Sequence, residues 1–311
     1  MLKAFSERFV IIVGFCCLLL LSFASGCSDR QEKQQKVEPP RGELKLGIIP
    51  EQNIFTQKKR YEPLAAYLSK RVGMELKIEI LSRYGNIINN FISGDMDAAF
   101  FGSFTGALAI KKLGVEPLAR PEYIDGTSTY YGLVFVRKDS GIKNAQDMKG
   151  KRFAFVDKAT TAGWLLPLHY LEEQGIADYS KWLGEVYFTG THEDAIHDVL
   201  NGRADIGAAK NTVFYRLAKK DSRLESELRI LATSPKVPAN GLLVSKDLDH
   251  SLKMKLKEAL LNMDKNPEGQ QVLKDFGAIK FIETSVEDYK PVFEYADHIG
   301  LDLATYDYMN E

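Results

Sequence analysis

The sequence contains very little cysteine, and all of it lies near one end. Its 311 residues include three cysteines, Cys16, Cys17 and Cys27. From Ser28 onward the chain therefore cannot form a disulfide, hold a metal through thiolates or use a thiol as a nucleophile.

The sequence also lacks an excess of charge of either sign. Lys and Arg number 41 and Asp and Glu number 42, which gives a net charge of −1. Because Lys3, Glu7 and Arg8 contribute +1, about −2 remains for the rest of the chain, with acidic and basic residues interspersed. Nothing in this pattern suggests the basic surface that nucleic acid binding needs, so we expect no nucleic acid partner.

Motifs of several enzyme classes are missing too. Neither a G-x-S-x-G nucleophile elbow nor a G-x-x-x-x-G-K-[ST] phosphate loop occurs. His192 and His197 lie five residues apart, so they do not share a helix face as the histidines of a zinc-protease motif do. We therefore expect no metal site, no cofactor and no catalysis.

The N-terminal segment is the first feature that is present. Lys3 and Arg8 make a basic start, residues 9–23 are an apolar run too short to span a membrane comfortably, and Ala24-Ser25-Gly26-Cys27 offers a small-residue cleavage site. Residues 1–26 resemble a bacterial lipoprotein signal peptide, which makes Cys27 the acylated first residue of the mature chain. Ala24 stands where such signals usually carry leucine, so ordinary secretion and a retained anchor remain alternatives.

A polar segment follows at residues 27–42. It is rich in Gln, Lys and Glu, contains Pro39-Pro40 and has almost no apolar residue. This composition is typical of a solvated tether. About 270 residues remain from Glu43 onward, enough for one large domain or for two lobes with separate cores.

Short β-like runs alternate with longer amphipathic stretches through this region, which predicts an α/β fold with largely parallel sheets. The expected strands lie at 44–49, 77–81, 98–101 and 133–137, and the expected helices at 61–72, 86–92 and 105–113. Ser103 is the expected cap of the last of these helices.

Residues 151–163, K-R-F-A-F-V-D-K-A-T-T-A-G, lead an apolar strand into hydroxyls and a glycine. Asp157 ends the strand, and residues 160–163 bring side-chain hydroxyls and the unpaired N–H groups of a helix start to one point. The helix dipole adds partial positive charge there, so the segment predicts a seat for an oxyanion. The alternative is that Thr160 only caps a helix.

Residues 91–98 and 199–206 share a pattern. Each gives a helix end, a glycine cap and, three residues later, an aspartate that opens a strand. The strands then run into helix starts at residues 102–105 and 210–212. Two similar halves facing each other would bring both helix starts to one cleft. The simpler explanation is that glycine-capped helices before strands are common.

Several short motifs occur in a fixed order along the chain. They are G-x-x-P at 47–50, Y-x-x-I-I at 84–88, S-G-I at 140–142, D-x-K-G-K at 147–151, a hydroxyl-rich loop at 157–163 and G-x-H at 190–192. In this order and spacing they resemble the phosphonate-binding family within the type 2 periplasmic binding proteins, which serve ABC importers of phosphate, phosphite and phosphonate. The resemblance covers nearly the whole mature chain.

The resemblance implies a set of ligand-binding residues. Tyr84 and Tyr130 would donate hydroxyls to phosphoryl oxygens, Thr160 and Thr161 would supply loop hydroxyls, and His192 would be a further donor. The rest of the expected set is Ser103, Thr105, Ala162, Asn211 and Asn240. Ala162 replaces the last loop serine of the family, and Gly132 stands where the family often has serine. Tyr130 as a core aromatic and His192 as a satisfied cap or surface histidine are the structural alternatives.

The resemblance also bears on the ligand. Aminoalkylphosphonate binders of the family carry carboxylates after an N-T pair and after a proline segment, and these hold the ligand's ammonium. Here those positions are Val213 and Asn240. The expected ligand therefore lacks an amine, and Lys210 adds a positive charge near that end unless it points to solvent.

The implied architecture is a two-lobed type 2 periplasmic binding protein. Each lobe is expected to be a mainly parallel sheet flanked by helices, with crossover strands near Val136 and Ser234 and closure by hinge motion. Lobe 1 would comprise residues 43–135 and 235–311, and lobe 2 residues 136–234. The C-terminal helices, at 252–263 and 286–299, would return to lobe 1.

The predicted function is that of a monomeric solute-binding protein, lipid-anchored at the periplasmic face of a membrane. It would capture phosphate, phosphite or an alkylphosphonate between its lobes and deliver this oxyanion to an ABC permease in the inner membrane. An extracytoplasmic sensor that feeds a signalling kinase would use the same pocket and is the main alternative. A hydrolase is less favoured, because the candidate pocket offers donors without an evident general base.

Overall fold

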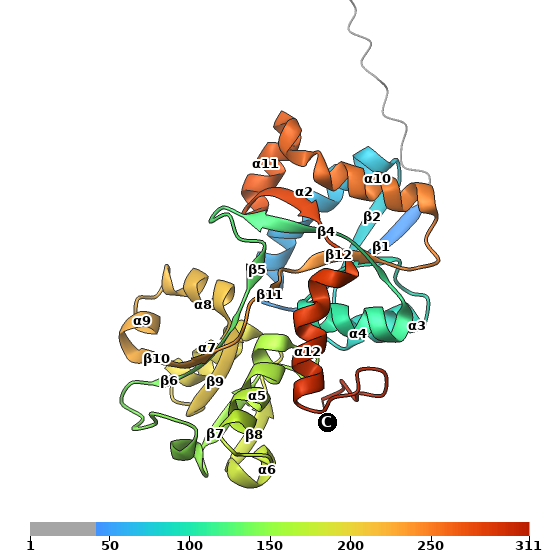
Figure 1. Ribbon diagram of the computed structural model, residues 1–311. Coiled ribbons are helices and arrows are strands. Elements are labelled where there is room, and N and C mark those ends of the chain that lie inside the picture. The colour runs from blue at the N-terminus through green and yellow to red at the C-terminus, as the bar shows by residue number, and fades with distance from the viewer. Residues whose placement is uncertain (1–41, 311) are drawn as a thin grey trace, which may run out of the picture. The chain divides into compact units, whose positions relative to one another are not determined.

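A computed structural model describes residues 42–310, which are coloured in Figure 1. The expected signal peptide, Cys27 and the tether up to residue 41 lie outside them. No helix within the described range is long and apolar enough to cross a membrane. The described chain forms two sheets with helices packed against them, and a short two-stranded ladder links the two halves.

The first sheet has six strands in the order β13-β4-β12-β3-β1-β2. Their bounds are β1 (Glu43–Ile48), β2 (Glu75–Ile80), β3 (Ala98–Phe101), β4 (Glu116–Tyr123), β12 (Gly241–Val244) and β13 (Ala278–Glu283). Strand β1 runs parallel to β2 and β3, whereas β12 and β13 pair antiparallel with their neighbours. The first lobe is thus built from two separate stretches of chain.

The second sheet has five strands in the order β10-β6-β9-β7-β8. Their bounds are β6 (Gly132–Arg137), β7 (Arg152–Phe155), β8 (Glu185–Phe188), β9 (Ile206–Lys210) and β10 (Leu228–Thr233). Strand β7 is parallel to β8 and β9, but β6 pairs antiparallel with β9 and β10. Both sheets are therefore mixed, and the expected parallel pairing holds only among the strands of the βα units.

The chain passes between the lobes at two short strands. β5 (Thr129–Tyr130) and β11 (Val237–Pro238) pair antiparallel, with Val237 opposite Tyr130. The expected crossing at Val136 is wrong, since Val136 lies inside β6 and pairs with Ile206 of the second sheet. The boundary between residues 135 and 136 moves accordingly to the segment between β5 and β6, because residues 132–136 pair with β9 of the second sheet.

The helices connect and cover these sheets. They are α2 (Ile54–Val72), α3 (Asn86–Ile92), α4 (Ser103–Leu113), α5 (Leu166–Glu173), α6 (Tyr179–Trp182), α7 (His192–Leu200), α8 (Asn211–Ala218), α9 (Arg223–Glu227), α10 (His250–Leu261), α11 (Pro267–Phe276) and α12 (Lys290–His298). The predicted bounds of α3 and β3 are confirmed.

Helix α2 begins well before the predicted start at residue 61. Asn53 caps it, because its side chain accepts a hydrogen bond from the backbone N–H of Phe55 at 2.9 Å. Its first two turns are mostly exposed, with only Gln57 buried, so they carry no apolar stripe for sequence reasoning to detect.

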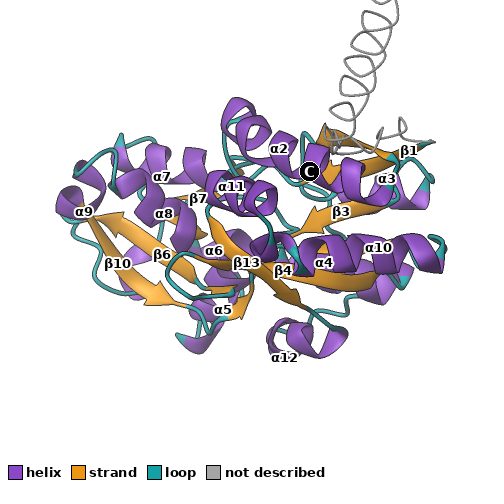
Figure 2. Cartoon of the chain, turned by 90° about the horizontal axis from the view of Figure 1, so that it is seen from above, coloured by secondary structure: helices purple, strands orange, loops and turns teal. Residues whose placement is uncertain are grey.

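The helix predicted at 252–263 is α10, which returns to the first lobe as expected, and α11 does so too. The helix predicted at 286–299 is α12, which packs on α4 of the first lobe but also stacks Tyr295 on His169 of α5 in the second, so that prediction holds only in part. Leu256, Leu260 and Phe276 pack with Tyr61 and Leu64 of α2 in one apolar cluster. Figure 2 shows β1 and β3 at one end of the described chain and β6 and β10 at the other. Each lobe therefore has its own sheet, with the link between them at β5 and β11.

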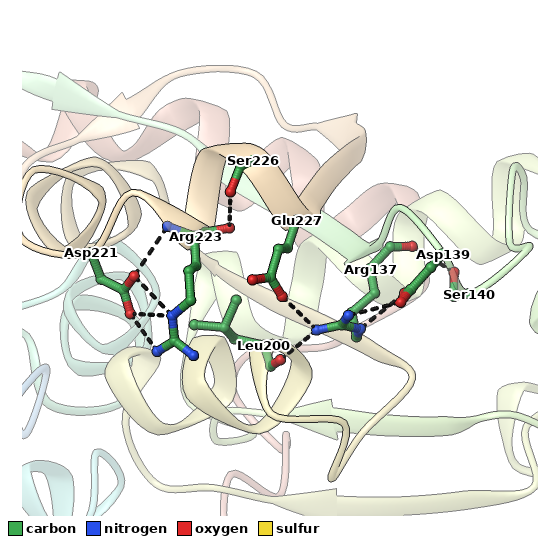
Figure 3. Close-up of polar contacts among 8 residues, drawn as sticks. All are labelled: Arg137, Asp139, Ser140, Leu200, Asp221, Arg223, Ser226 and Glu227. Carbon is green, nitrogen blue, oxygen red and sulfur yellow. Dashed lines mark hydrogen bonds and ion pairs between the residues drawn. The ribbon is translucent and has the colours of Figure 1, made fainter.

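An ion network fixes the edge of the second lobe (Figure 3). Arg137, at the end of β6, donates to the carbonyl of Leu200 at 2.7 Å and to Glu227 Oε2 at 2.9 Å, and its other nitrogens bind Asp139. This guanidinium ties β6 to the end of α7 and to α9.

Candidate functional site

A small pocket lies between the two lobes. Its empty volume is about 220 Å³, part of which is open to solvent. The lining residues are Ile49, Glu51, Tyr84, Gly102, Ser103, Phe104, Tyr130, Ala159, Thr160, Thr161, His192 and Asn240. They come from the ends of β1, β3 and β7, the starts of α3, α4 and α7, and the two linking strands, which is where ligands collect in open α/β sheets.

Most of the residues predicted for the site line this pocket. They are Tyr84, Ser103, Tyr130, Thr160, Thr161, His192 and Asn240. Three others have different surroundings. Thr105 donates its hydroxyl to the carbonyl of Gly102 at 3.2 Å, Asn211 accepts from the backbone N–H of Tyr131 at 3.1 Å, and Ala162 is buried beneath Gly132. These three are corrections to the predicted lining.

Hydroxyls from the two lobes meet in the pocket. Ser103 Oγ lies 2.5 Å from Tyr130 Oη and 2.6 Å from Thr161 Oγ1. The expected capping role of Ser103 is wrong, because α4 begins at this residue, Gly102 occupies the N-cap position and no side chain caps the helix. The Ser103 hydroxyl instead joins the first lobe to the loop of the second.

The loop that leads into α5 is held by its own backbone. Thr160 occupies the N-cap position, but its side chain does not cap the helix and instead donates to the carbonyl of Asp157 at 2.7 Å. A π-helical turn, Thr161–Leu165, precedes α5. The capping interpretation of Thr160 is therefore wrong for its side chain, and Thr161 turns its hydroxyl into the cleft.

Gly163 shows why this loop needs glycine. A Cβ at Gly163 would lie 2.3 Å from the Cβ of Val156 and 2.8 Å from Thr160 Oγ1. Real Cβ atoms cannot approach so closely, so the tight packing of the loop on β7 depends on the missing side chain.

Three further polar atoms of the pocket are buried and have no partner within residues 42–310. They are Tyr84 Oη, His192 Nδ1 and Asn240 Nδ2. Burial raises the pKa of Tyr84 well above 10, so its hydroxyl keeps its proton. Burial, aided by the Lys210 charge and opposed by Glu51, lowers the pKa of His192 to about 3, so the imidazole is neutral. Each of these groups can donate a hydrogen bond without carrying a charge.

A buried ion pair adjoins the pocket. The sequence indicated Lys210 but not its partner Glu51. Lys210 Nζ lies 2.8 Å from Glu51 Oε1 and 2.8 Å from Asn240 Oδ1, and 4.1 Å from the centre of the Tyr130 ring. Lys210 is 2% exposed and Glu51 6%. Glu51 lines the pocket, so a carboxylate stands beside the donors that the sequence led us to expect there.

Both members of this pair are charged. Burial raises the pKa of Glu51, but the attraction and hydrogen bond of Lys210 outweigh it and lower the pKa to about 2. Burial likewise lowers the pKa of Lys210, and Glu51 raises it to above its ordinary value. Glu51 directly follows Pro50, shortly after the end of β1. This position after a buried strand is the sequence feature that could have identified Glu51 as a pocket residue. The pair contributes no net charge to the pocket.

Two lobes linked by a short ladder, with a donor-lined pocket between their strand ends, define a periplasmic-type solute-binding protein. Residues 46–289 match the family model described as "ABC transporter, phosphonate, periplasmic substrate-binding protein". The chain belongs to this family, and the resemblance inferred from its motifs is confirmed. The family acts outside the cytoplasm as a component of ABC transporters.

Similar proteins agree with this assignment. The probable ABC transporter phosphite binding protein PhnD1 of Prochlorococcus marinus is 27% identical over 263 residues, which cover 81% of this chain and 88% of that protein. The phosphate-import protein PhnD of Mycolicibacterium smegmatis is 30% identical over 213 residues, which cover 65% of each. The solved structure of PhnD1 in complex with methylphosphonate has a TM-score of 0.73 at 25% identity and covers 83% of this chain and 98% of that one.

Proposed function

We propose that this protein captures a small phosphorus oxyanion between its two lobes and delivers it to the membrane permease of an ABC importer. One observation carries the proposal, namely that hydrogen-bond donors from both lobes converge on a single pocket. These donors are Tyr84, Ser103, Tyr130, Thr161, His192 and Asn240.

The donors suit a tetrahedral oxyanion. A phosphonate or phosphite presents three acceptor oxygens, and a hydrogen bond to a charged group contributes about 1.5–3 kcal/mol net. Because Tyr84, His192 and Asn240 have polar atoms without a partner in the described part of the chain, these atoms can bind an incoming anion without first giving up bonds there.

The size of the pocket favours a small ligand. The lining side chains leave little free space between them, so a ligand of few heavy atoms suits the pocket best. Phosphite, methylphosphonate and phosphate are the candidates. The similar proteins support this group, since PhnD1 of Prochlorococcus is a probable phosphite binder solved with methylphosphonate and PhnD of Mycolicibacterium is a phosphate-import protein.

The pocket is better suited to binding than to turnover. A general base works best when its pKa lies near the working pH. The pKa of His192 is lowered to about 3, and the Glu51 carboxylate is held by Lys210 with a pKa of about 2. We therefore propose a non-enzymatic protein, and further a monomer that is lipid-anchored through Cys27 at the periplasmic face of the membrane.

Isothermal titration calorimetry tests the proposed ligand class. The protein from Cys27 onward, with Cys27 replaced by serine, is titrated with phosphate, phosphite and methylphosphonate. We expect saturable binding of one molecule for at least one of the three. Binding of none of them would overturn the proposal, as would equal binding by a variant that carries both Thr161→Val and His192→Ala.

A further inference from the structure

The surroundings of Lys210 form a complete site for an alkylammonium group. Its Nζ contacts a carboxylate oxygen of Glu51, the amide oxygen of Asn240 and the face of the Tyr130 ring. Anionic, dipolar and aromatic partners are what a buried ammonium requires. Lys210 comes from the end of β9 in the second lobe, whereas Glu51 and Asn240 belong to the first.

This ammonium site shares its walls with the oxyanion pocket. Glu51, Asn240 and Tyr130 all line the pocket, while Lys210 lies behind them. Tyr130 also contacts Ser103, and Ser103 contacts Thr161, so the ammonium site and the hydroxyl cluster adjoin within one chain of contacts. A ligand with a phosphonate at one end and an ammonium at the other would meet both sites.

We propose that Lys210 determines the specificity of this protein by filling, with its own ammonium, the place that the amine of a ligand would otherwise take. This inference rests on the proposed function. The protein then binds phosphorus oxyanions without an amine and rejects zwitterionic aminoalkylphosphonates.

The balance of charge supports this role. Glu51 and Lys210 neutralise each other, so a second ammonium in the pocket would have no free carboxylate and would lie near a like charge. Removal of the Lys210 side chain leaves the Glu51 carboxylate buried without its partner. A ligand ammonium can then replace the lost charge, and the space of the lysine stem accommodates its carbon spacer.

The experiment compares two ligands that differ only in the amine, ethylphosphonate and 2-aminoethylphosphonate. Calorimetry on the wild-type protein should give at least tenfold tighter binding of ethylphosphonate. The variant Lys210→Ala should shift the ratio of the two affinities toward 2-aminoethylphosphonate by tenfold or more. The double variant Glu51→Gln/Lys210→Ala should lose this shift, because its amine partner is gone.

The results distinguish a failure of the Lys210 proposal from a failure of the proposed function. If the wild-type protein binds phosphite or methylphosphonate but prefers 2-aminoethylphosphonate to ethylphosphonate, the role of Lys210 is overturned while the proposed function stands. An unchanged ratio in a folded Lys210→Ala variant overturns it as well. If Lys210→Ala fails to fold, the variant Lys210→Met/Glu51→Gln replaces it, because it keeps the side-chain volume and the zero net charge of the pair. The ratio of the two affinities in the wild-type protein then still decides whether a ligand amine is rejected. If no phosphorus oxyanion binds at all, both proposals fall.

Discussion

At the scale of single residues, Thr161 offers the sharpest test of the pocket. Its hydroxyl contacts Ser103 across the cleft. Thr105 is equally buried, but its hydroxyl donates to the carbonyl of Gly102. Thr161→Val should weaken oxyanion binding by about tenfold to a hundredfold, because it removes one hydrogen bond to a charged group. Calorimetry measures this loss.

Thr105→Val is the matched control for that substitution. It removes the same hydroxyl from a residue that does not line the pocket, so the affinity should stay within about twofold of wild type. Equal losses of affinity in the two variants would show that Thr161 acts through the fold and not on the ligand.

His192 makes a prediction about stability and pH. Its folded pKa of about 3 lies below the ordinary value of 6.5, so the unfolded chain takes up the proton first as the pH falls. The free energy of unfolding of the wild-type protein should therefore decrease from pH 6.5 to pH 4.5, relative to His192→Gln, by up to about 1.4 kcal/mol per pH unit. Urea unfolding of both proteins without ligand measures the difference, and parallel pH profiles would refute a buried neutral histidine.

At the scale of elements, the turn between β7 and α5 determines where the loop hydroxyls lie. Gly163→Ala would place a methyl group 2.3 Å from Val156 Cβ, which the backbone can relieve only by moving the Thr160 and Thr161 segment. We expect lower thermal stability and, in the folded fraction, at least tenfold weaker oxyanion binding. Thermal unfolding and calorimetry give the two readouts.

Gly269→Ala is the control for that turn. Its Cβ would lie 2.1 Å from the carbonyl oxygen of Met263, a comparable clash, but it lies in α11 on the first lobe. It should reduce stability without changing the affinity of the folded protein. Unchanged affinity in Gly163→Ala would contradict a role for the turn in placing the hydroxyls.

The repeated glycine–aspartate pattern was predictable from sequence, and the structure supplies its cause. Asp97 Oδ2 accepts the backbone N–H of Lys45 at 2.9 Å, and Asp205 Oδ2 accepts that of Arg152 at 2.9 Å. In each lobe the aspartate therefore ties the start of one strand to its parallel neighbour. Local patterns of this kind, with the apolar runs, were enough to locate β3 and α3.

Other features could not be predicted because nothing local encodes them. The linking strands β5 and β11 are two residues each, too short for any periodicity, so the first crossing, expected near Val136, lies earlier in the chain than predicted. Glu51 and Lys210 are separated by 159 positions, and only the fold brings them together. Val213, expected at the amine end of the site, is fully buried in the core of the second lobe with Leu133 and Phe135.

At the scale of the described chain, several contacts hold the lobes together around the pocket. Lys210 pairs with Glu51, Arg216 donates to Gln52, and the backbone N–H of Asn53 donates to Glu193. All three run from the segment after β1 to the second lobe. The link at β5 and β11 is narrow, so hinge motion about it would open the cleft by breaking these bonds together with other contacts between the lobes, such as that of Ser103 with Thr161.

The proposed membrane attachment rests on Cys27, which lies outside the described residues. A single acyl chain binds membranes only marginally, whereas the several chains of a lipoprotein hold stably. Cys27→Ser should release the protein from the membrane fraction or leave it unprocessed. Mass spectrometry of the wild-type N-terminus is the direct check, and an unlipidated terminus at another residue would contradict the anchor.

The central claim, an oxyanion held by donors from both lobes, is tested most directly by a crystal structure with methylphosphonate or phosphite bound. The account predicts phosphoryl oxygens at roughly 2.6–3.2 Å from Thr161 Oγ1, Tyr84 Oη and a nitrogen of His192, with the Lys210–Glu51 pair intact. An anion bound elsewhere, or one held by residues of a single lobe, would contradict it.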